Sequence, residues 1–475
     1  MRVQRHSPIT SRESAMTTEK IHASILSGQL DPIFGANGLA VLRSPNPDFP
    51  NWSSRVVAVG PDNMIYIAGV LYDDVNGMLF ALTRLNEAGS VDTSFGKQGF
   101  FYDFFYGSAN SSFYAEQIAF VNGRILLTGT LFYRVGGVSA RDKAAVRFLP
   151  NGTIDKEFGK EGKVIIPAPN TTADLHAVSA YNEKCLEIEK SRCVSSDSLN
   201  KLAPYVRETS PITDDRIILL HESGTFASID AWIICLTPSG ELDLSFNESG
   251  FVRVRHDIFN FLQLSSLIVD DAGNYISAGH VKTGYSNPPE AVVLVKHSKD
   301  GKLDKSFQRD GFLVMEDEDP LYYREVANIV KQPNNRILCT GSRHSRHDTA
   351  ISGFLMSLEA DGSNNIQFNG GKPVFMNINS SSTYLYTADF LPDGSFLTTG
   401  LLERYRKESH YSISRFFYNG VHDKDYNNGV GWLDYKEAVN IGLYSSAIKD
   451  NKAFFAVEFK EETVVIRAVA KGLMP

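Results

Sequence analysis

The chain has 475 residues, of which 43% are hydrophobic, 11% aromatic and 21% charged, and its formal net charge is −8 at pH 7. A chain this rich in apolar and aromatic side chains can bury a core, so we expect an ordered protein. The acidic balance argues against nucleic-acid binding, which needs a strong positive charge. One core rarely exceeds roughly 250–300 residues, so the length predicts either several domains or a repeat architecture.

The first twenty residues are polar and lack an apolar run of seven, which predicts a disordered tail over 1–20 and no secretory signal. Met16 is an alternative start. No stretch of eighteen apolar residues occurs, so no membrane span is expected. These features predict a monomer that is cytoplasmic or exported without a classical signal peptide. Four cysteines are too few for a disulfide framework, and Cys185 and Cys193 are expected to be a reduced pair, with a disulfide as the alternative.

Seven copies of one motif divide the chain from residue 28 onward. Five clear copies, such as GQLDPIFGANG and GSVDTSFGKQG, start near residues 28, 89, 152, 240 and 301, and altered copies start near 362 and 420. Successive starts are 58 to 63 residues apart, apart from one interval of 88. The excess lies at about 183–213, an insertion in the third unit. Such a period predicts a single repeat domain over residues 21–475.

Each unit carries four strand-like segments and no helical periodicity. A short apolar strand follows the motif, as in FVRV at 251–254, and a hairpin such as QIAFVNGRILLTG comes next. Asn-Gly and Asp-Gly pairs supply the positive φ angles of its turn. A further strand then leads into the next motif. We therefore predict an all-β, seven-bladed β-propeller of four-stranded antiparallel blades, because closing a ring of blades removes exposed sheet edges.

The most regular motif residues are expected to be structural. The Asp is placed to accept hydrogen bonds from turn N–H groups, and the Phe is placed to fill the seam between blades. An acidic ring that binds a cation is the alternative, although Asn365 breaks the series. The predicted structural residues are Asp31, Phe34, Asp92, Phe95, Asp155, Phe158, Asp243, Phe246, Asp304 and Phe307.

The pattern G-x-[LIV]-D-x-x-F-G-x-x-G, followed by a strand and a Gly-terminated hairpin about every sixty residues, resembles the bacterial delta-60 repeat. The resemblance covers residues 28 to 475. It implies a propeller-type fold and a bacterial origin, but it carries over no catalytic residue. Asn364 and Asn365 replace the Leu-Asp pair in the sixth copy, and His422 replaces the apolar residue in the seventh.

Function is sought where the copies differ, in the loops at the end opposite the motif. These loops are rich in aromatic residues, which suit protein or sugar recognition, and two of them form a basic patch. Alternatively, the aromatic residues only cover the ends of the strands. The basic patch is alternatively a solvated edge without a ligand. The predicted binding residues are Phe104, Phe105, Tyr106, Phe259, Tyr322, Tyr323, Arg343, His344, Arg346, His347, Tyr384, Arg404, Tyr405 and Arg406.

Three functions are compatible with this pattern. We predict a non-enzymatic scaffold that presents variable loops to a protein or glycan partner, with no metal and no cofactor. A propeller hydrolase or lyase with a site at the central channel is the first alternative, although no G-x-S-x-G, HExxH or phosphate loop occurs. A structural module of a secreted or surface assembly is the second. An enzyme should show acidic or His side chains converging at one channel mouth, whereas a scaffold should show an aromatic face without them.

Overall fold

A computed structural model shows an all-β protein. It describes residues 28–73, 75–105, 111–135, 138–167, 212–213, 215–224, 227–404, 408–435, 446–459 and 462–470. The predicted tail at 1–20 lies outside the described residues, as does the insertion at 183–213 except for its last two positions. Within the described part of the chain, no helix has the length and apolar character needed to cross a bilayer.

Five antiparallel sheets have four strands each. One contains β2 (Asn51–Val59), β3 (Ile65–Asp73), β4 (Gly77–Leu85) and β5 (Phe100–Asp103), and the next contains β6 (Ser111–Val121), β7 (Arg124–Val135), β8 (Val138–Phe148) and β9 (Lys163–Ile166). Two more are formed by β17 (Tyr322–Lys331), β18 (Ile337–Ser345), β19 (Ile351–Leu358) and β20 (Val374–Met376), and by β21 (Ser382–Phe390), β22 (Phe396–Arg404), β23 (Glu408–Phe416) and β24 (Trp432–Tyr435). The fifth contains β25 (Ser446–Lys449), β26 (Lys452–Phe459), β27 (Glu462–Val469) and β1 (Leu39–Leu42).

A sixth sheet has seven strands. It contains β10 (Ile217–Gly224), β11 (Ile229–Leu236), β12 (Phe251–Val254), β13 (Phe261–Val269), β14 (Tyr275–Lys282), β15 (Ala291–His297) and β16 (Phe312–Glu316). One parallel pair, Ile229 with Phe261, joins β11 to β13. Short helical turns lie in the connections: η2 (Pro333–Asn335), η3 (Asn369–Gly371), η4 (Ile378–Ser380) and α3 (Tyr426–Gly429).

The short strand after each motif completes the sheet that precedes the motif. β5 follows the motif copy at 89 and pairs with β4, the strand just before that copy. The sequence analysis placed this strand first in its own unit, and that assignment is wrong because the motif turns the chain back onto the strand it has just left. The last sheet would therefore lack its outer strand. β1, from the other end of the described chain, supplies it by pairing with β27.

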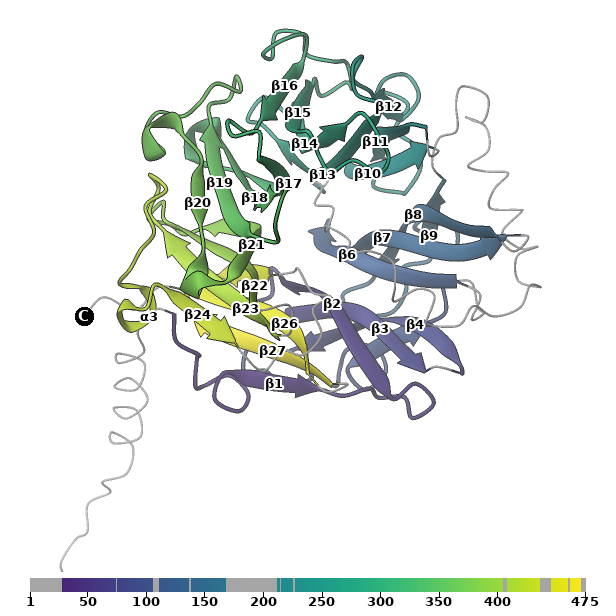
Figure 1. Cartoon of the computed structure of the whole chain (residues 1–475). Helices are drawn as coiled ribbons and strands as arrows, with labels where there is room; N and C mark the ends of the chain where they lie inside the picture. Colours follow the sequence, from purple (N-terminus) through teal and green to yellow (C-terminus); the bar gives the residue numbers. More distant parts are fainter. Residues whose placement is uncertain are drawn as a thin grey trace, which may run out of the picture.

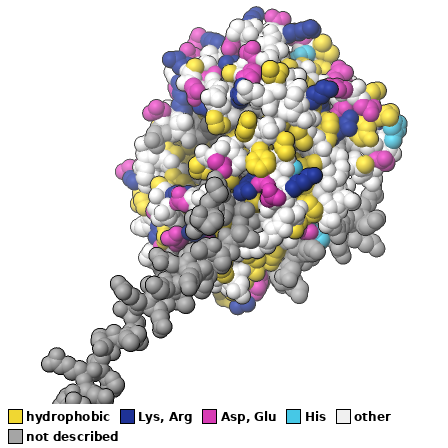
Figure 2. Space-filling view, turned by 90° about the vertical axis from the view of Figure 1, so that its left-hand side faces the viewer, with side chains coloured by type: hydrophobic (Ala, Val, Ile, Leu, Met, Phe, Trp, Pro, Cys, Tyr) yellow, Lys and Arg dark blue, Asp and Glu magenta, His cyan; other side chains and the backbone are white. Residues whose placement is uncertain are grey.

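The sheets are arranged around a common centre, as Figure 1 shows, with β2, β6, β13, β17 and β21 innermost. Neighbouring inner strands contact one another, as β13 does with β17 and β17 with β21. The apolar cores lie between adjacent sheets: Phe80 of β4, for example, packs edge-to-face on Phe113 of β6 at 5.7 Å between ring centroids. On the side that carries β20 and β24, charged side chains of both signs are mixed with apolar ones (Figure 2). This arrangement of four-stranded antiparallel sheets is a β-propeller.

A β-bulge recurs in the inner strands and fixes their register. In β17 it lies between Val326 and Asn328, opposite Gly341 of β18. A Cβ at Gly341 would collide with the carbonyl oxygen of Glu325, so only glycine allows the strands to approach this closely. Glu325, the residue before the bulge pair, is therefore held at a defined position.

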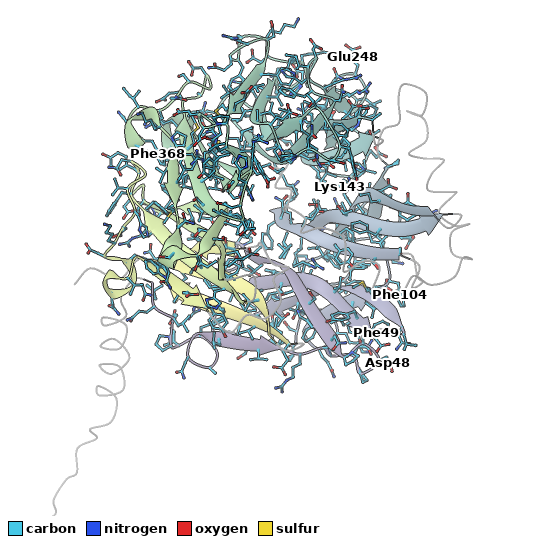
Figure 3. The ribbon with its side chains drawn as sticks, in the orientation of Figure 1. Asp48, Phe49, Phe104, Lys143, Glu248 and Phe368 are labelled. Carbon is cyan, nitrogen blue, oxygen red and sulfur yellow. The ribbon has the colours of Figure 1, made fainter. Side chains whose placement is uncertain are left out.

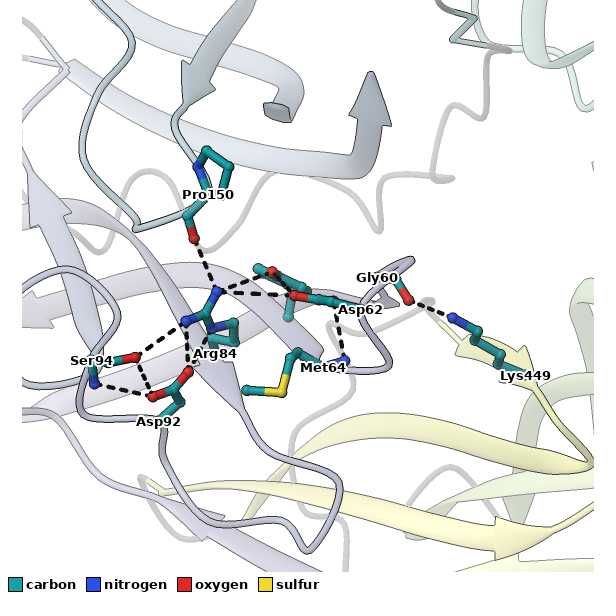
Figure 4. Close-up of polar contacts among 9 residues, drawn as sticks. Gly60, Asp62, Met64, Arg84, Asp92, Ser94, Pro150 and Lys449 are labelled. Atoms are coloured by element: carbon teal, nitrogen blue, oxygen red, sulfur yellow. Dashed lines mark hydrogen bonds and ion pairs between the residues drawn. The ribbon is translucent and has the colours of Figure 1, made fainter. Parts of the chain in front are cut away.

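An arginine that was not among the predicted residues joins several of the motifs to the next sheet. Arg84 forms an ion pair with Asp92 at 2.6 Å (Figure 4). The Arg84 guanidinium carbon lies 4.9 Å from the ring centroid of the fully buried Phe95. The same guanidinium donates a hydrogen bond to the carbonyl oxygen of Pro150, in the next repeat, at 2.9 Å. Asp92 Oδ1 also accepts the Ser94 N–H at 3.0 Å. We call this group of Arg, Asp and Phe the joint.

The joint is repeated around the ring. Arg147 pairs with Asp155 at 2.9 Å, lies 4.9 Å from the Phe158 ring and donates to the Pro238 carbonyl at 2.6 Å. Arg467 of β27 pairs with Asp31 at 3.0 Å and donates to the Glu87 carbonyl at 2.5 Å. Arg467 is fully buried, so this copy links the two ends of the described chain through a buried ion pair.

Where the motif changes, the partner changes with it. Cys235 stands at the arginine position before Asp243, and Arg216 from the adjacent segment supplies the guanidinium, at 2.9 Å from Asp243. In the sixth copy Ser357 and Asn365 replace the charged pair, and the Asn365 amide donates to Ser357 Oγ at 2.9 Å. Loss of the carboxylate is thus matched by loss of the guanidinium, which avoids a buried unpaired charge.

We predict that Arg467→Met lowers the free energy of unfolding by about 3–5 kcal/mol, because it leaves the Asp31 carboxylate buried without its partner. Arg467→Met combined with Asp31→Asn should recover more than half of this loss, since no unpaired charge remains. Denaturant unfolding checks both variants, with the exposed Lys305→Met as control. Equal stability of the single and double variants would contradict the role of the ion pair.

Candidate active site

Polar and aromatic side chains meet where β13, β17 and β21 begin, at the end of the ring opposite the motif turns. Gln263 of β13, Glu325 of β17 and Tyr384 of β21 occupy the same register position, one residue before the residue that pairs with the bulge glycine. Tyr323 lies two residues before Glu325 and shares its face, since side chains alternate along a strand. Three adjacent inner strands thus bring different side chains to one level around the centre.

Tyr323 and His344 form a stacked pair across β17 and β18. They are opposite one another in the register, and their rings are 4.9 Å apart with planes 7° from parallel. His344 Nε2 lies 3.6 Å from Glu325 Oε2 and 2.8 Å from Ser342 Oγ. Burial lowers the pKa of His344 to about 4. At neutral pH the imidazole is therefore uncharged and gives Glu325 no positive partner.

Tyr384 brings a second carboxylate from the next sheet. Its hydroxyl donates to Glu403 Oε2 at 3.3 Å, and its ring lies 6.0 Å from that of His344. The Tyr386 ring is stacked against it at 6.0 Å, with planes 17° from parallel. Burial raises the pKa of Tyr384, and the charges of Glu403 and Glu325 raise it further. The hydroxyl therefore stays protonated and orients Glu403.

Glu325 is the most chemically distinctive member of the group. Its side chain is 36% exposed, so solvent and ligands reach it, yet protein surrounds it closely enough to restrict its hydration. This desolvation raises the pKa of Glu325, against a smaller lowering by the Lys282 ammonium. A reachable carboxyl group with a raised pKa can hold a proton and donate it, which is the property a general acid requires.

The polar surface continues from Gln263 towards β10. Gln263 Nε2 donates to both carboxylate oxygens of Glu222, at 3.0 and 3.2 Å, and its Oε1 lies 3.0 Å from His280 Nε2. Arg141 of β8 pairs with Glu222 at 3.0 Å. Burial lowers the pKa of His280 to about 4, so this imidazole too is neutral at neutral pH.

A separate ion pair lies on β6–β8. Lys143 Nζ is 2.8 Å from Glu116 Oε2, and the Lys143 side chain is only 6% exposed. Figure 3 shows Lys143 beside the centre of the ring. Among the residues that the structure describes, no three His, Cys, Asp or Glu side chains lie close enough together to hold a metal ion.

Of the predicted binding residues, the structure brings together Tyr323, His344, Arg346 and Tyr384. The Arg346 guanidinium carbon lies 5.2 Å from the Tyr323 ring centroid. Arg343, by contrast, donates to both oxygens of Asp317 at 2.7 and 2.9 Å, and lies 3.9 Å from the Tyr322 ring. Arg343 and Tyr322 thus pack together around an ion pair.

The remaining aromatic candidates do not gather at this site. Phe105 is only 2% exposed and packs on Phe113 at 5.1 Å, which corrects the prediction that it lies on an exposed face. Phe104 packs edge-to-face on Phe49 at 5.9 Å, as Figure 3 indicates. Phe259 lies 5.1 Å from His256.

The other predicted binding residues are His347, Arg404, Tyr106, Tyr405 and Arg406. His347 is exposed. Arg404 ends β22, while Tyr106, Tyr405 and Arg406 lie outside the described residues.

Sequence reasoning missed Glu325, Glu403, Gln263 and Lys282. The available signal was a polar residue in the inner strand two positions before the bulge residue: Gln263 in FLQLSS and Glu325 in YYREVAN. Both residues stand at the same repeat position of their strands. Glu403 lies near the end of β22 and Lys282 ends β14. Their positions near Glu325 depend on how adjacent sheets are rotated about the centre, which the sequence does not give.

Fold and site together define a β-propeller with a titratable cluster at one end of its centre. A family model described as "Domain of unknown function (DUF5122) beta-propeller" matches residues 60–95. A search of curated protein sequences gave no significant match.

Solved structures are similar over most of their lengths at low identity. An ulvan lyase of polysaccharide lyase family PL25, bound to -[GlcA(1-4)Rha3S]-, is 10% identical with a TM-score of 0.45 over 95% of this chain and 96% of that chain. The β-propeller domain of the Trilobed protease from Pyrococcus furiosus is 9% identical (TM-score 0.41, over 88% and 93%). A Penicillium chrysogenum α-L-arabinanase complexed with arabinobiose is 9% identical (TM-score 0.39, over 92% and 99%).

The prediction of a non-enzymatic scaffold is wrong. In this chain, Glu325, Glu403 and His344 converge at one end of the inner strands, which is the feature expected of an enzyme and not of a scaffold. The prediction failed because it weighed motifs along the sequence, whereas these side chains come from separate strands.

We predict that Glu325→Gln stabilises the fold at neutral pH. Because the folded-state pKa of Glu325 is raised, the folded protein resists ionisation that the unfolded chain undergoes near its ordinary value of about 4.3. Melting temperatures of wild type and variant should coincide below about pH 4 and separate as pH rises, with the variant higher. Glu248→Gln, at an exposed rim position (Figure 3), controls for net charge. A variant that is less stable at pH 7 would contradict the raised pKa.

Proposed function

We propose that the chain is a glycan-cleaving enzyme, a hydrolase whose site lies at the loop end of the inner strands. The observation that carries the proposal is the convergence of Glu325, with its raised pKa, on a Tyr384–Glu403 pair from the next sheet. Two carboxyl groups with different environments are what acid–base hydrolysis of a glycosidic bond requires.

In the proposed reaction, Glu325 donates its proton to the glycosidic oxygen as the bond from that oxygen to the anomeric carbon breaks. A water molecule attacks the anomeric carbon and gives its proton to Glu403, which the Tyr384 hydroxyl orients. Proton exchange with solvent then restores both carboxyl groups. The neutral His344 lies beside Glu325 without drawing its proton away, since burial lowers the pKa of His344 to about 4.

The aromatic side chains support a carbohydrate substrate. The stacked pairs Tyr323–His344 and Tyr384–Tyr386 present flat apolar faces beside the carboxyl groups. The C–H face of a sugar ring packs well on such a surface, while its hydroxyls reach polar groups such as Gln263. A small number of polar groups beside aromatic faces is typical of small-molecule and cofactor sites.

The proposal includes the finer architecture. The seven-stranded sheet is taken as two blades, a three-stranded one ending at β12 and a four-stranded one of β13–β16, joined by the parallel pair of Ile229 and Phe261. With the five four-stranded sheets this gives seven blades in one domain, in agreement with seven motif copies. The spacing of about sixty residues and the family match at 60–95 support a delta-60 repeat protein.

We predict that Glu325→Gln lowers kcat by about 10²–10⁴-fold, because the amide cannot donate the proton. Glu403→Gln should give a loss of similar size. The assay measures reducing ends released from a panel of neutral and acidic polysaccharides, and ultraviolet absorbance reports any unsaturated uronate.

Glu248→Gln should keep full activity. Unsaturated product would replace the hydrolase proposal with a lyase. Full turnover by Glu325→Gln, or no turnover of the panel by wild type, would overturn the proposed site.

A further inference from the structure

Two cations at the loop end of the site have no carboxylate partner. Lys282 and Arg346 each lack, among the described residues, any Asp or Glu oxygen within 4.0 Å that would form an ion pair. Lys282 Nζ donates to the carbonyl of Tyr285 at 2.8 Å, and Arg346 Nη2 donates to the carbonyl of Pro289 at 3.3 Å. Both partners belong to the loop between β14 and β15.

Several other cations near the inner strands are paired with carboxylates, whereas Arg55 of β2 lies over the Tyr114 ring, 4.7 Å from its centroid. Arg343 and Arg324 share Asp317, Arg141 pairs with Glu222, and Lys143 pairs with Glu116. Unlike these paired cations, Lys282 and Arg346 are not neutralised at contact distance by any carboxylate of the described residues. On the outer surface in Figure 2, by contrast, acidic and basic side chains are interspersed.

Both cations border the proposed catalytic group. The Arg346 guanidinium carbon lies 5.2 Å from the Tyr323 ring centroid, and the Lys282 ammonium is close enough to lower the pKa of Glu325. Lys282 also lies 5.8 Å from the rings of Phe261 and Tyr285. Lys282 ends β14 and Arg346 follows β18, so the two cations come from neighbouring groups of strands.

One carboxylate does act on this group from the loop. Glu290 accepts hydrogen bonds from the Thr283 N–H and hydroxyl at 2.8 and 2.5 Å. Desolvation raises the pKa of Glu290, but these hydrogen bonds, with the charge of Arg346, leave it lowered overall. Glu290 Oε1 is thus engaged by Thr283. The Arg346 guanidinium therefore still has N–H donors with which to bind an anion other than Glu290.

We propose that Lys282 and Arg346 bind an anionic substituent of the substrate, a carboxylate or a sulfate, so that the enzyme takes acidic glycans. This inference rests on the proposed function, since it names the substrate class of the same site. A protein with a net charge of −8 repels polyanions at a distance, so their binding requires unneutralised cations at the site itself. Arg346 lies beside Tyr323, and Lys282 lies beside Phe261 and Tyr285, so each cation borders aromatic rings on which a sugar could pack.

The experiment measures equilibrium binding by calorimetry with matched polymers. Polygalacturonate and its fully methyl-esterified form test a carboxylate, while dextran sulfate and dextran test a sulfate. We expect at least one anionic polymer to bind ten-fold or more tightly than its neutral partner. Lys282→Met and Arg346→Met should each weaken that binding five-fold or more, whereas Arg346→Lys should retain most of it and Lys305→Met should change nothing.

Equal affinity for charged and neutral partners, or unchanged binding by both Met variants, would overturn the inference. Binding without turnover also separates the two proposals. If Glu325→Gln binds the anionic polymer as wild type does and loses only turnover, both stand. Should Glu325→Gln keep full turnover while the Met variants lose binding, the acidic-glycan inference survives and the catalytic assignment fails. If the wild type cleaves only neutral glycans and Glu325→Gln loses that activity, the catalytic assignment stands and the acidic-glycan inference fails.

Discussion

The ion pair between an arginine and the motif aspartate determines how one sheet meets the next. Each guanidinium neutralises a carboxylate, covers an aromatic ring and donates to a carbonyl of the following repeat, as Arg84 does with Asp92, Phe95 and Pro150. These contacts act together, because a buried charge without its partner is far more costly than the pair is favourable. The Arg467–Asp31 copy, fully buried, carries the same constraint between the last described strand and the first motif.

Concentrating the joints at one end of the sheets leaves the other end free to vary. The inner strands are held in register by the bulge opposite a glycine, so a residue such as Glu325 occupies a defined level whatever its side chain. The same level holds Gln263 in β13 and Tyr384 in β21. A rigid repeated frame therefore offers one equivalent position per sheet at the centre, and different side chains there create a site without disturbing the frame.

Much of the fold could be predicted from the sequence because the repeat consists of residues with strong preferences for particular backbone conformations or for burial. Gly, Asp and Phe recur at fixed offsets, and D/N-G pairs mark the hairpins. The pairing of the short strand was not predictable in the same way, since it depends on the motif returning the chain to the strand before it. The site was less predictable still. Tyr323, His344 and Tyr384 were found as loop-end aromatics and bases, but Glu325 and Glu403 were missed, because their convergence needs the rotation between two sheets.

The carboxyl group of Glu325 has an electrostatic cost for the folded state. An acid in a partly desolvated position with a neutral imidazole beside it destabilises the folded state at neutral pH, and the frame tolerates this because its joints are elsewhere. Lys282 reduces the cost without removing it, since its ammonium acts on Glu325 from beyond contact distance. A direct ion pair would lower the pKa of Glu325. The separation that leaves Lys282 without an ion pair among the described residues is thus the same feature that keeps the pKa of Glu325 raised.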